Sequence, residues 1–129
     1  MVSVVSLLPE LEKRGLNVKI IYGSSPELFA LQPEGYREKM LSEADRADST
    51  VISTQSRASM RDWIFNHVGE AYALTADWDN RWRTGGTLDE VIDEAHLSPR
   101  WLLEGIVRFV NERKARLERL QAGVAAALK

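Results

Sequence analysis

The stretch Asn17-Val18-Lys19-Ile20-Ile21-Tyr22-Gly23-Ser24-Ser25-Pro26 decides the fold class that this sequence predicts. Its first six residues are mostly β-branched or aromatic and lie between Gly15 and Gly23, a pattern typical of a short strand. Ser25 then precedes a proline, and this pair is typical of a helix start with serine as the N-cap. A strand followed at once by a helix indicates an α/β unit.

Strand and helix patterns alternate along the rest of the chain. Two further β-rich runs occupy residues 49–54 and 70–75, and helical patterns precede, separate and follow them. Because such alternation favours a parallel sheet with right-handed crossovers, we predict a three-layer α/β/α domain with a short, mostly parallel sheet. Its strands are expected near residues 18–22, 50–54 and 70–76.

Helix signals are clearest in the second half of the chain. Thr87 and Glu90 have the spacing of a capping box, and that helix is expected to end near Ala95. The longest helix is expected to start at Ser98, with one apolar face. Three further helices are predicted: a short one that starts after Ser25, one from about residue 33 to residue 41, and one over residues 60–67. The apolar face of the longest helix consists of Leu102, Ile106, Phe109 and Val110.

The two ends of the chain are read from weaker patterns. Helix is favoured for the first sixteen residues, although Val2-Ser3-Val4-Val5 is β-branched enough for a strand. Residues 111–129 are predicted to be a helical C-terminal extension, solvated because residues 112–119 are mostly charged, and frayed after Gly123.

Composition restricts the function classes. A chain of 129 residues fits one domain. It has no cysteine, which excludes disulfides and thiolate chemistry, and its two histidines make a zinc cluster unexpected. The net charge of −2 gives no electrostatic reason to expect nucleic acid or an anionic membrane as partner. The apolar opening residues lack the basic start of a signal peptide, and a cytoplasmic location is expected.

Two loops could hold a ligand. Residues 23–26 follow a predicted strand and open a helix, so they could bind a phosphate, but the same residues also describe a plain turn with an N-cap. Without a glycine-rich fingerprint, the N-cap is the favoured interpretation. The loop after the third strand could be a contact surface, a structural loop or a ligand site. Its polar and aromatic residues are Asp77, Trp78, Asp79, Arg81, Trp82 and Arg83.

No set of residues suggests catalysis by this chain alone. His67 is expected on the apolar face of a helix and His96 at a helix end, and neither has a partner at a catalytic spacing. The four carboxylates Asp89, Glu90, Asp93 and Glu94 are expected to form a solvated face with one capping role. We therefore predict no catalytic, cofactor-binding or metal-binding residue.

Residues 25–38 resemble a stretch of the C-terminal domain of the transketolase family. The shared pattern is Glu-Leu-Phe, a short spacer, and Gln-x-x-x-Tyr-Arg, and it follows Glu-Lys-Arg-Gly and a strand, as in the family. Looser similarities extend the resemblance over residues 11–110. They are Trp63 with His67-Val68-Gly69, Asp79-Asn80-Arg81-Trp82 with Gly85-Gly86, Leu97-Ser98, and Ile106-Val107.

The sequence also departs from the family pattern. Thr54-Gln55-Ser56 stands where the family often has an acidic residue and a glycine, and His96 replaces a usual glycine. The segment from Trp63 to Gly69 is one residue longer than in the family. The family's domain has two strands before the helix that ends at Gly15. Residues 2–7 are therefore either a remnant of the central strand, or the domain is truncated at its N-terminus.

The resemblance implies a structural, dimer-supporting domain of a thiamine-diphosphate-dependent enzyme that transfers ketol groups between sugar phosphates. In the family, thiamine diphosphate and a divalent metal bind between the two preceding domains, and no cofactor-binding position maps onto this chain. The implied partners are a second copy and the other domains of the same enzyme. Two alternatives remain. One is the equivalent domain of a 2-oxo-acid dehydrogenase component, although Gln32 together with Tyr36-Arg37 argues against it. The other is a free-standing flavodoxin-like binding module.

Overall fold

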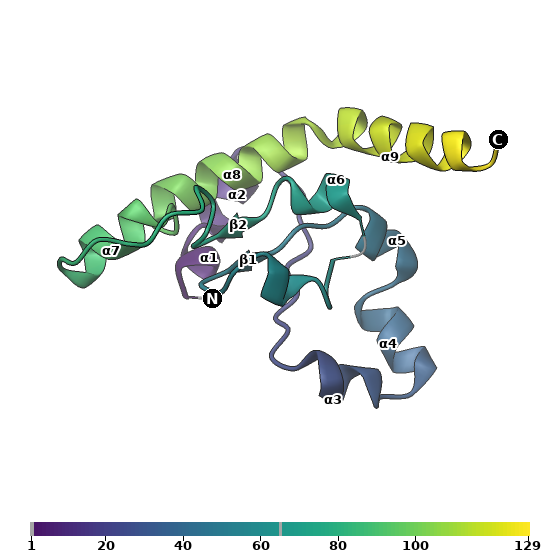
Figure 1. Cartoon of the computed structure of the whole chain (residues 1–129), viewed down its shortest axis with the longest axis horizontal. Coiled ribbons are helices and arrows are strands. Elements are labelled where there is room, and N and C mark those ends of the chain that lie inside the picture. Colours follow the sequence, from purple (N-terminus) through teal and green to yellow (C-terminus); the bar gives the residue numbers. More distant parts are fainter. Residues whose placement is uncertain (1, 65) are drawn as a thin grey trace.

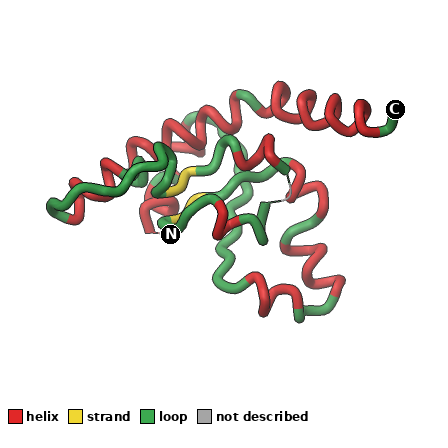
Figure 2. Tube along the Cα trace, in the orientation of Figure 1, coloured by secondary structure: helices red, strands yellow, loops and turns green. Residues whose placement is uncertain are grey.

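The computed structural model describes residues 2–64 and 66–129, which form a small sheet, several short helices and two longer helices at the C-terminal end (Figure 1). Helices and connecting loops make up most of the chain (Figure 2), and the described residues also form one small parallel sheet. The fold is therefore of the mixed α/β class that the sequence predicts. The elements are α1 (Val2–Ser6), α2 (Leu8–Lys13), α3 (Pro26–Ala30), α4 (Glu34–Met40), α5 (Glu43–Ala47), β1 (Ile52–Ser53), η1 (Ala58–Met60), α6 (His67–Glu70), β2 (Leu74–Thr75), α7 (Leu88–Glu94), α8 (Pro99–Asn111) and α9 (Arg113–Ala127).

The two strands run parallel, as predicted. Ile52 lies opposite Leu74 and Ser53 opposite Thr75, and the N–H of Leu74 donates to the carbonyl of Val51 at 2.9 Å. Each strand has only two residues, fewer than predicted. Parallel strands need a crossover connection, and the segment that contains η1 and α6 provides it.

The strand predicted near residues 18–22 is wrong. The chain there has no strand pairing, and no backbone N–H or carbonyl of residues 17–22 forms a hydrogen bond with a described residue. A strand preference is realised only when a neighbouring strand supplies the ladder and the packing. Within the described residues, the sheet therefore consists of β1 and β2.

Side-chain caps explain where several helices begin. The Ser25 hydroxyl accepts a hydrogen bond from the first turn of α3, and Thr87 and Glu90 form the predicted capping box of α7. A second capping box, Ser42 with Asp45, starts α5, a helix that sequence analysis missed. Local side-chain bonds of this kind set helix starts independently of tertiary structure.

The helix predicted over residues 60–67 is wrong. The described part of this segment forms only the single 3-10 turn η1 before α6 begins, and Phe65 lies outside the described residues. Asn66 sets the new start, because its side-chain oxygen accepts the N–H of Gly69 at 2.7 Å. The helix α6 then occupies the beginning of the strand predicted over residues 70–75, which shortens that strand to β2.

The core lies where α1 and α8 meet the sheet. Val4, Leu7 and Leu102 are buried together, and Gly105 lets α8 approach β2, since a Cβ there would lie 2.5 Å from Leu74 Cδ2. Partly buried residues complete it: Ile52, Leu74, Leu97, Leu103 and Ile106. The helical interpretation of the first sixteen residues is confirmed, and the alternative that residues 2–7 are a remnant strand is wrong.

The C-terminal extension is helical, as predicted, but it is not solvated throughout. The helix α9 continues past Gly123 to Ala127. Arg116 on this helix is only 2% exposed. Its guanidinium donates to the carbonyl of Phe109 at 3.0 Å and to Asp48 Oδ1 at 3.0 Å. This buried arginine attaches α9 to the body of the domain.

Candidate functional site

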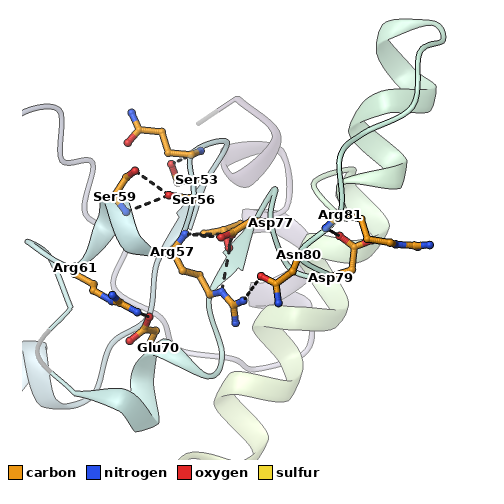
Figure 3. Close-up of polar contacts among 12 residues, drawn as sticks. Ser53, Ser56, Arg57, Ser59, Arg61, Glu70, Asp77, Asp79, Asn80 and Arg81 are labelled. Carbon is orange, nitrogen blue, oxygen red and sulfur yellow. Dashed lines mark hydrogen bonds and ion pairs between the residues drawn. The ribbon is translucent and has the colours of Figure 1, made fainter.

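Both strands end at the same edge of the sheet, and polar residues follow each of them (Figure 3). The chain after β1 carries Ser56 and Arg57, and the chain after β2 carries Asp77. Ligands of open α/β sheets bind outside the carboxyl ends of parallel strands. The geometry of these side chains therefore decides what this edge can do.

The carboxylate of Asp77 joins the two segments. It accepts the backbone N–H of Arg57 at 3.1 Å and the hydroxyl of Thr75 at 2.7 Å. The Arg57 guanidinium lies 3.9 Å from the same carboxylate and donates to Asn80 Oδ1 at 3.4 Å. These bonds link the loops after β1 and β2 into one network (Figure 3).

The protonation state of Asp77 suits this linking role. Burial raises the pKa of Asp77. Hydrogen bonds from the Thr75 hydroxyl and the Arg57 N–H, together with the Arg57 charge, lower the pKa by more than burial raises it, so the net pKa lies below its ordinary value. A general base works best with a pKa near the working pH and with access to the proton that it removes. Asp77 is ionised and engaged by donors, so it connects two loops rather than moving protons.

The serines at this edge bond to each other. Ser56 Oγ and Ser59 Oγ lie 2.9 Å apart, and the Ser59 N–H donates to Ser56 Oγ at 3.3 Å. In the described residues, neither hydroxyl is bonded to a histidine or a carboxylate. A nucleophilic serine needs such an adjacent base, so this pair forms a turn and has no activated nucleophile.

A stack of three rings lies beside the loop after β2. The His96 imidazole is sandwiched between Trp78, at 3.7 Å between centroids, and Trp101, at 3.8 Å, with all planes nearly parallel. The backbone of His96 has φ 60°, in the left-handed region that glycine adopts without strain. Residues other than glycine seldom adopt this conformation, and here the ring stack accompanies it.

Arg83 fixes the loop after β2 against the end of α7. Its guanidinium pairs with Asp79 and donates to the backbone carbonyl of Glu94 at 2.7 Å. The Trp78 indole N–H donates to the same carbonyl at 3.1 Å, and the Thr84 hydroxyl donates to the Glu94 carboxylate at 2.6 Å. Asp79, Trp78 and Arg83 thus have structural roles in the loop.

Trp82 is the exception in this loop, because its side chain is 97% exposed. Its neighbour Arg81 is also exposed and pairs with Asp79 at 3.1 Å. Tryptophan and arginine are enriched among the residues that dominate binding energy at protein interfaces. The loop therefore combines a fixed base with a protruding indole, which favours the contact-surface interpretation for Trp82.

The turn at residues 23–26 has the role of a helix cap. The Ser25 hydroxyl accepts the N–H of Leu28 at 3.2 Å and donates to Glu27 at 3.0 Å. The helix that follows has only five residues. Its cap is thus supplied by the chain itself, and we assign no phosphate site there.

The two histidines lie in different surroundings. His96 ends α7, as predicted, and is half-buried in the ring stack. His67 is exposed at the first residue of α6, so its predicted position on an apolar face is wrong. The reason is the later helix start, which Asn66 sets.

The acidic run of α7 is engaged rather than simply solvated. Glu90 caps the helix, and Glu94 binds Thr84. Asp93 pairs with Arg100 at 2.7 Å and accepts the Ser98 hydroxyl at 2.7 Å. Hydrogen bonds from Arg100 and Ser98 lower the pKa of Asp93 to about 2. Asp89 is exposed, so the predicted solvated face holds for that residue.

Sequence analysis missed two contributors to this region. Trp101 lies in the first turn of α8 and completes the stack on His96, and Arg57 joins the strand ends through its own backbone N–H. Trp101 was detectable as a large aromatic residue near the start of a predicted helix. Arg57 carried no local signal, because its partner Asp77 is 20 residues away.

Among residues 2–64 and 66–129, no group of three or more His, Asp or Glu side chains could hold a metal ion. In the same part of the chain, no helix has the length and apolar character needed to cross a bilayer. Comparison with known proteins gave no matching family model, no matching curated protein and no matching solved structure.

The stability of the domain is expected to fall below neutral pH because of His96. Burial lowers the pKa of His96; Arg83 and Arg100 lower it further, while Asp79 and Asp93 oppose the shift. A histidine whose folded-state pKa is depressed contributes stability above its unfolded pKa, about 6.5. That contribution is lost as the pH falls through the folded-state pKa. Urea unfolding at pH 7.5 and pH 5.5 would measure the loss.

Two asparagine variants isolate the histidine responsible. Asparagine tolerates the left-handed backbone of position 96, so His96→Asn is expected to reduce the pH dependence while keeping the helix end. His67→Asn, at an exposed position, is expected to leave it unchanged. Equal pH dependence in wild type and His96→Asn would contradict the assignment.

Proposed function

We propose that this chain is the C-terminal domain of a transketolase-like, thiamine-diphosphate-dependent enzyme, or part of that domain. Its role is to support the dimer and to pack against the rest of the enzyme. It contributes no catalytic, cofactor-binding or metal-binding residue. Ketol transfer between sugar phosphates is the activity of the whole enzyme in this proposal.

The exposed arm, which we define as residues 12–40, carries the proposal. Every residue of this arm is exposed or only partly buried, whereas Leu11 and Leu41 at its two ends are buried. In Figure 1, α3 and α4 of the arm lie away from the long helix α8. Its exposed apolar side chains are Ile20, Ile21, Tyr22, Leu28, Leu31, Tyr36 and Met40.

This exposure supports a contact role for the segment that resembles the family. Residues 25–38 contain the Glu-Leu-Phe and Tyr-Arg pattern, and they lie within the exposed arm. Large groups of exposed apolar side chains are typical of protein contact sites. The resemblance implies a domain that packs against its own enzyme, and this arm provides apolar surface for such packing.

The finer architecture belongs to the same proposal. In the assembled enzyme, the parallel pair of β1 and β2 would be part of a larger sheet covered by helices on both sides, in the three-layer α/β/α manner. Sheets of two short strands are seldom stable alone. Association with further strands would therefore extend the sheet that the isolated chain has.

Two measurements on the isolated chain test the proposal. Calorimetry with thiamine diphosphate and magnesium is expected to show no binding, because no cofactor position maps onto this chain.

Light scattering across a dilution series is expected to show more than a monomer, and Trp82→Ala is expected to weaken this association if the loop after β2 is part of the contact.

The two outcomes count against different parts of the proposal. Micromolar binding of thiamine diphosphate at one site per chain would overturn the non-catalytic role. A monomer at every concentration would overturn the dimer-supporting role. Val124→Ala, an exposed apolar substitution at the far end of α9, is the control for nonspecific loss of apolar surface.

A further inference from the structure

A pocket lies between the exposed arm and the body of the domain. Its volume is about 370 Å³, and it is lined by residues of α3, α4 and α5 and by residues 62–63. Figure 1 shows α3, α4 and α5 following one another along the same side of the molecule. Pockets for small molecules commonly have a volume of about 300–1,000 Å³, with a few polar groups among apolar ones. The size of this pocket therefore suits a small molecule.

Two aromatic rings give the pocket an apolar wall. The rings of Phe29 on α3 and Trp63 lie 5.7 Å apart between centroids, with an angle of 48° between their planes, and both residues are partly buried. Gly23 packs closely against the Trp63 indole, since an added Cβ there would lie 3.0 Å from the ring. Aromatic rings bind one another in offset and edge-to-face arrangements. The wall therefore suits a ligand that carries an aromatic ring.

Arg37 gives the pocket a positive charge with free donors. Most arginines of the chain pair with a carboxylate, but the Arg37 Nε donates to the backbone carbonyl of Gln32 at 3.0 Å. Within residues 2–64 and 66–129, the two terminal nitrogens of Arg37 have no hydrogen-bond or ion-pair partner. The planar guanidinium matches the geometry of a carboxylate. Arg37 therefore suits a ligand with a carboxylate group.

Two acidic residues define the second charge of the ligand. Glu27 and Asp62 line the pocket together with Arg37 and Arg46, so the formal charges of its walls cancel. Glu27 accepts the Ser25 hydroxyl at 3.0 Å, whereas the Asp62 side chain has no hydrogen bond or ion pair with a described residue. A phosphate or a nucleotide would be repelled by both carboxylates. A ligand with one negative and one positive group is complementary to these walls.

We propose that this pocket binds a free amino acid with an aromatic side chain. Arg37 binds the carboxylate of the ligand, Asp62 binds its ammonium group, and Phe29 and Trp63 contact its ring. The proposal goes beyond the dimer-supporting role and does not depend on it, because residues of this chain alone line the pocket.

Titration of the whole chain with L-phenylalanine, followed by NMR, tests the proposal. The chain has four tryptophans, and Trp63→Phe identifies the indole N–H signal of Trp63 by removing it. L-Phenylalanine is expected to shift this signal with a Kd of about 1 mM or lower. Phenethylamine lacks the carboxylate and 3-phenylpropionate lacks the ammonium group. Each should bind at least about tenfold more weakly, because hydrogen bonds to charged groups are the stronger ones.

Two variants match each charge of the ligand to its residue. Arg37→Gln should weaken the binding of L-phenylalanine about tenfold and leave the binding of phenethylamine unchanged, since that analogue has no carboxylate. Asp62→Asn should weaken L-phenylalanine similarly and leave 3-phenylpropionate unchanged. Asp62 is exposed, so this variant keeps the test decisive if Arg37→Gln does not fold. Arg119→Gln, exposed on α9 and outside the pocket, is the matched control and should change neither affinity.

Three results would overturn the proposal. The first is an unchanged Trp63 signal at about 20 mM L-phenylalanine. The second is equal binding of L-phenylalanine and N-acetyl-phenylalaninamide, which has the ring without either charge and represents an aromatic residue of a peptide. The third is binding that neither Arg37→Gln nor Asp62→Asn weakens, which would place the ligand elsewhere. Light scattering measures self-association separately, so each of these results leaves the dimer-supporting role standing.

Discussion

Replacing Arg116 with alanine is expected to lower the free energy of unfolding by about 2–4 kcal/mol. The guanidinium is buried and donates to Asp48 Oδ1 at 3.0 Å and to the Phe109 carbonyl at 3.0 Å. It also lies 3.6 Å from the centroid of the Phe109 ring. Removal breaks these bonds and leaves a cavity at the junction of α8 and α9. Asp48 keeps a second partner, Arg113, so the expected loss lies below that of a carboxylate left wholly unpaired.

Urea denaturation followed by tryptophan fluorescence measures this loss. Arg119→Ala is the matched control, because Arg119 lies on the same helix and is exposed, and its change is expected to stay within about 0.5 kcal/mol. Arg116→Lys keeps the charge but loses the planar fork of donors, so it should fall between the wild type and alanine. Equal stability of Arg116→Ala and Arg119→Ala would show that α9 is not attached through this residue.

Arg116 also shows where prediction from sequence stops. Its neighbours from 112 to 119 are mostly charged, and such a run is ordinarily a solvated helix face. The partner that changes this is Asp48, 68 residues earlier in the chain. No local pattern contains that information, so the helix could be predicted and its buried arginine could not.

The same distinction explains the outcomes for the helices and strands. The starts of α3 and α7 were predictable because Ser25 and Thr87 bond within three residues of themselves. The run at residues 17–22 has strand composition, but a strand forms only when another segment pairs with it. Asn66 illustrates the local exception that sequence analysis missed, since a single cap moved the start of α6 and shortened β2.

The candidate contact loop was predictable in part. Its exposed tryptophan and its charged residues are visible in the sequence as a dense polar and aromatic segment after a strand. The sequence does not show that Trp78, His96 and Trp101 stack, because the three rings come from a loop, the end of α7 and the first turn of α8. Nor does the sequence show that Asp79 and Arg83 pair with each other inside the loop while Trp82 protrudes from it.

Replacing Leu102 with alanine is expected to cost about 3 kcal/mol of stability, within a range of roughly 2–5 kcal/mol for a buried leucine. Leu102 is 2% exposed and packs with Val4 of α1 and with Leu7, which lies between α1 and α2. Alanine keeps the helical propensity of α8, so the loss comes from buried apolar contact and from the cavity. Thermal unfolding followed by circular dichroism should show a clear fall in midpoint.

Two comparisons identify the contact responsible. Leu128→Ala removes the same atoms at a position that is 84% exposed and should change stability by less than about 0.5 kcal/mol. Val4→Ala combined with Leu102→Ala should cost less than the sum of the two single losses, with a coupling of about 0.5–1 kcal/mol, because residues in contact are not additive. Strict additivity would mean that α1 does not pack on α8 in solution. The helical interpretation of the first residues would then lose its tertiary support, since α1 has only five residues and helices that short are not stable without packing.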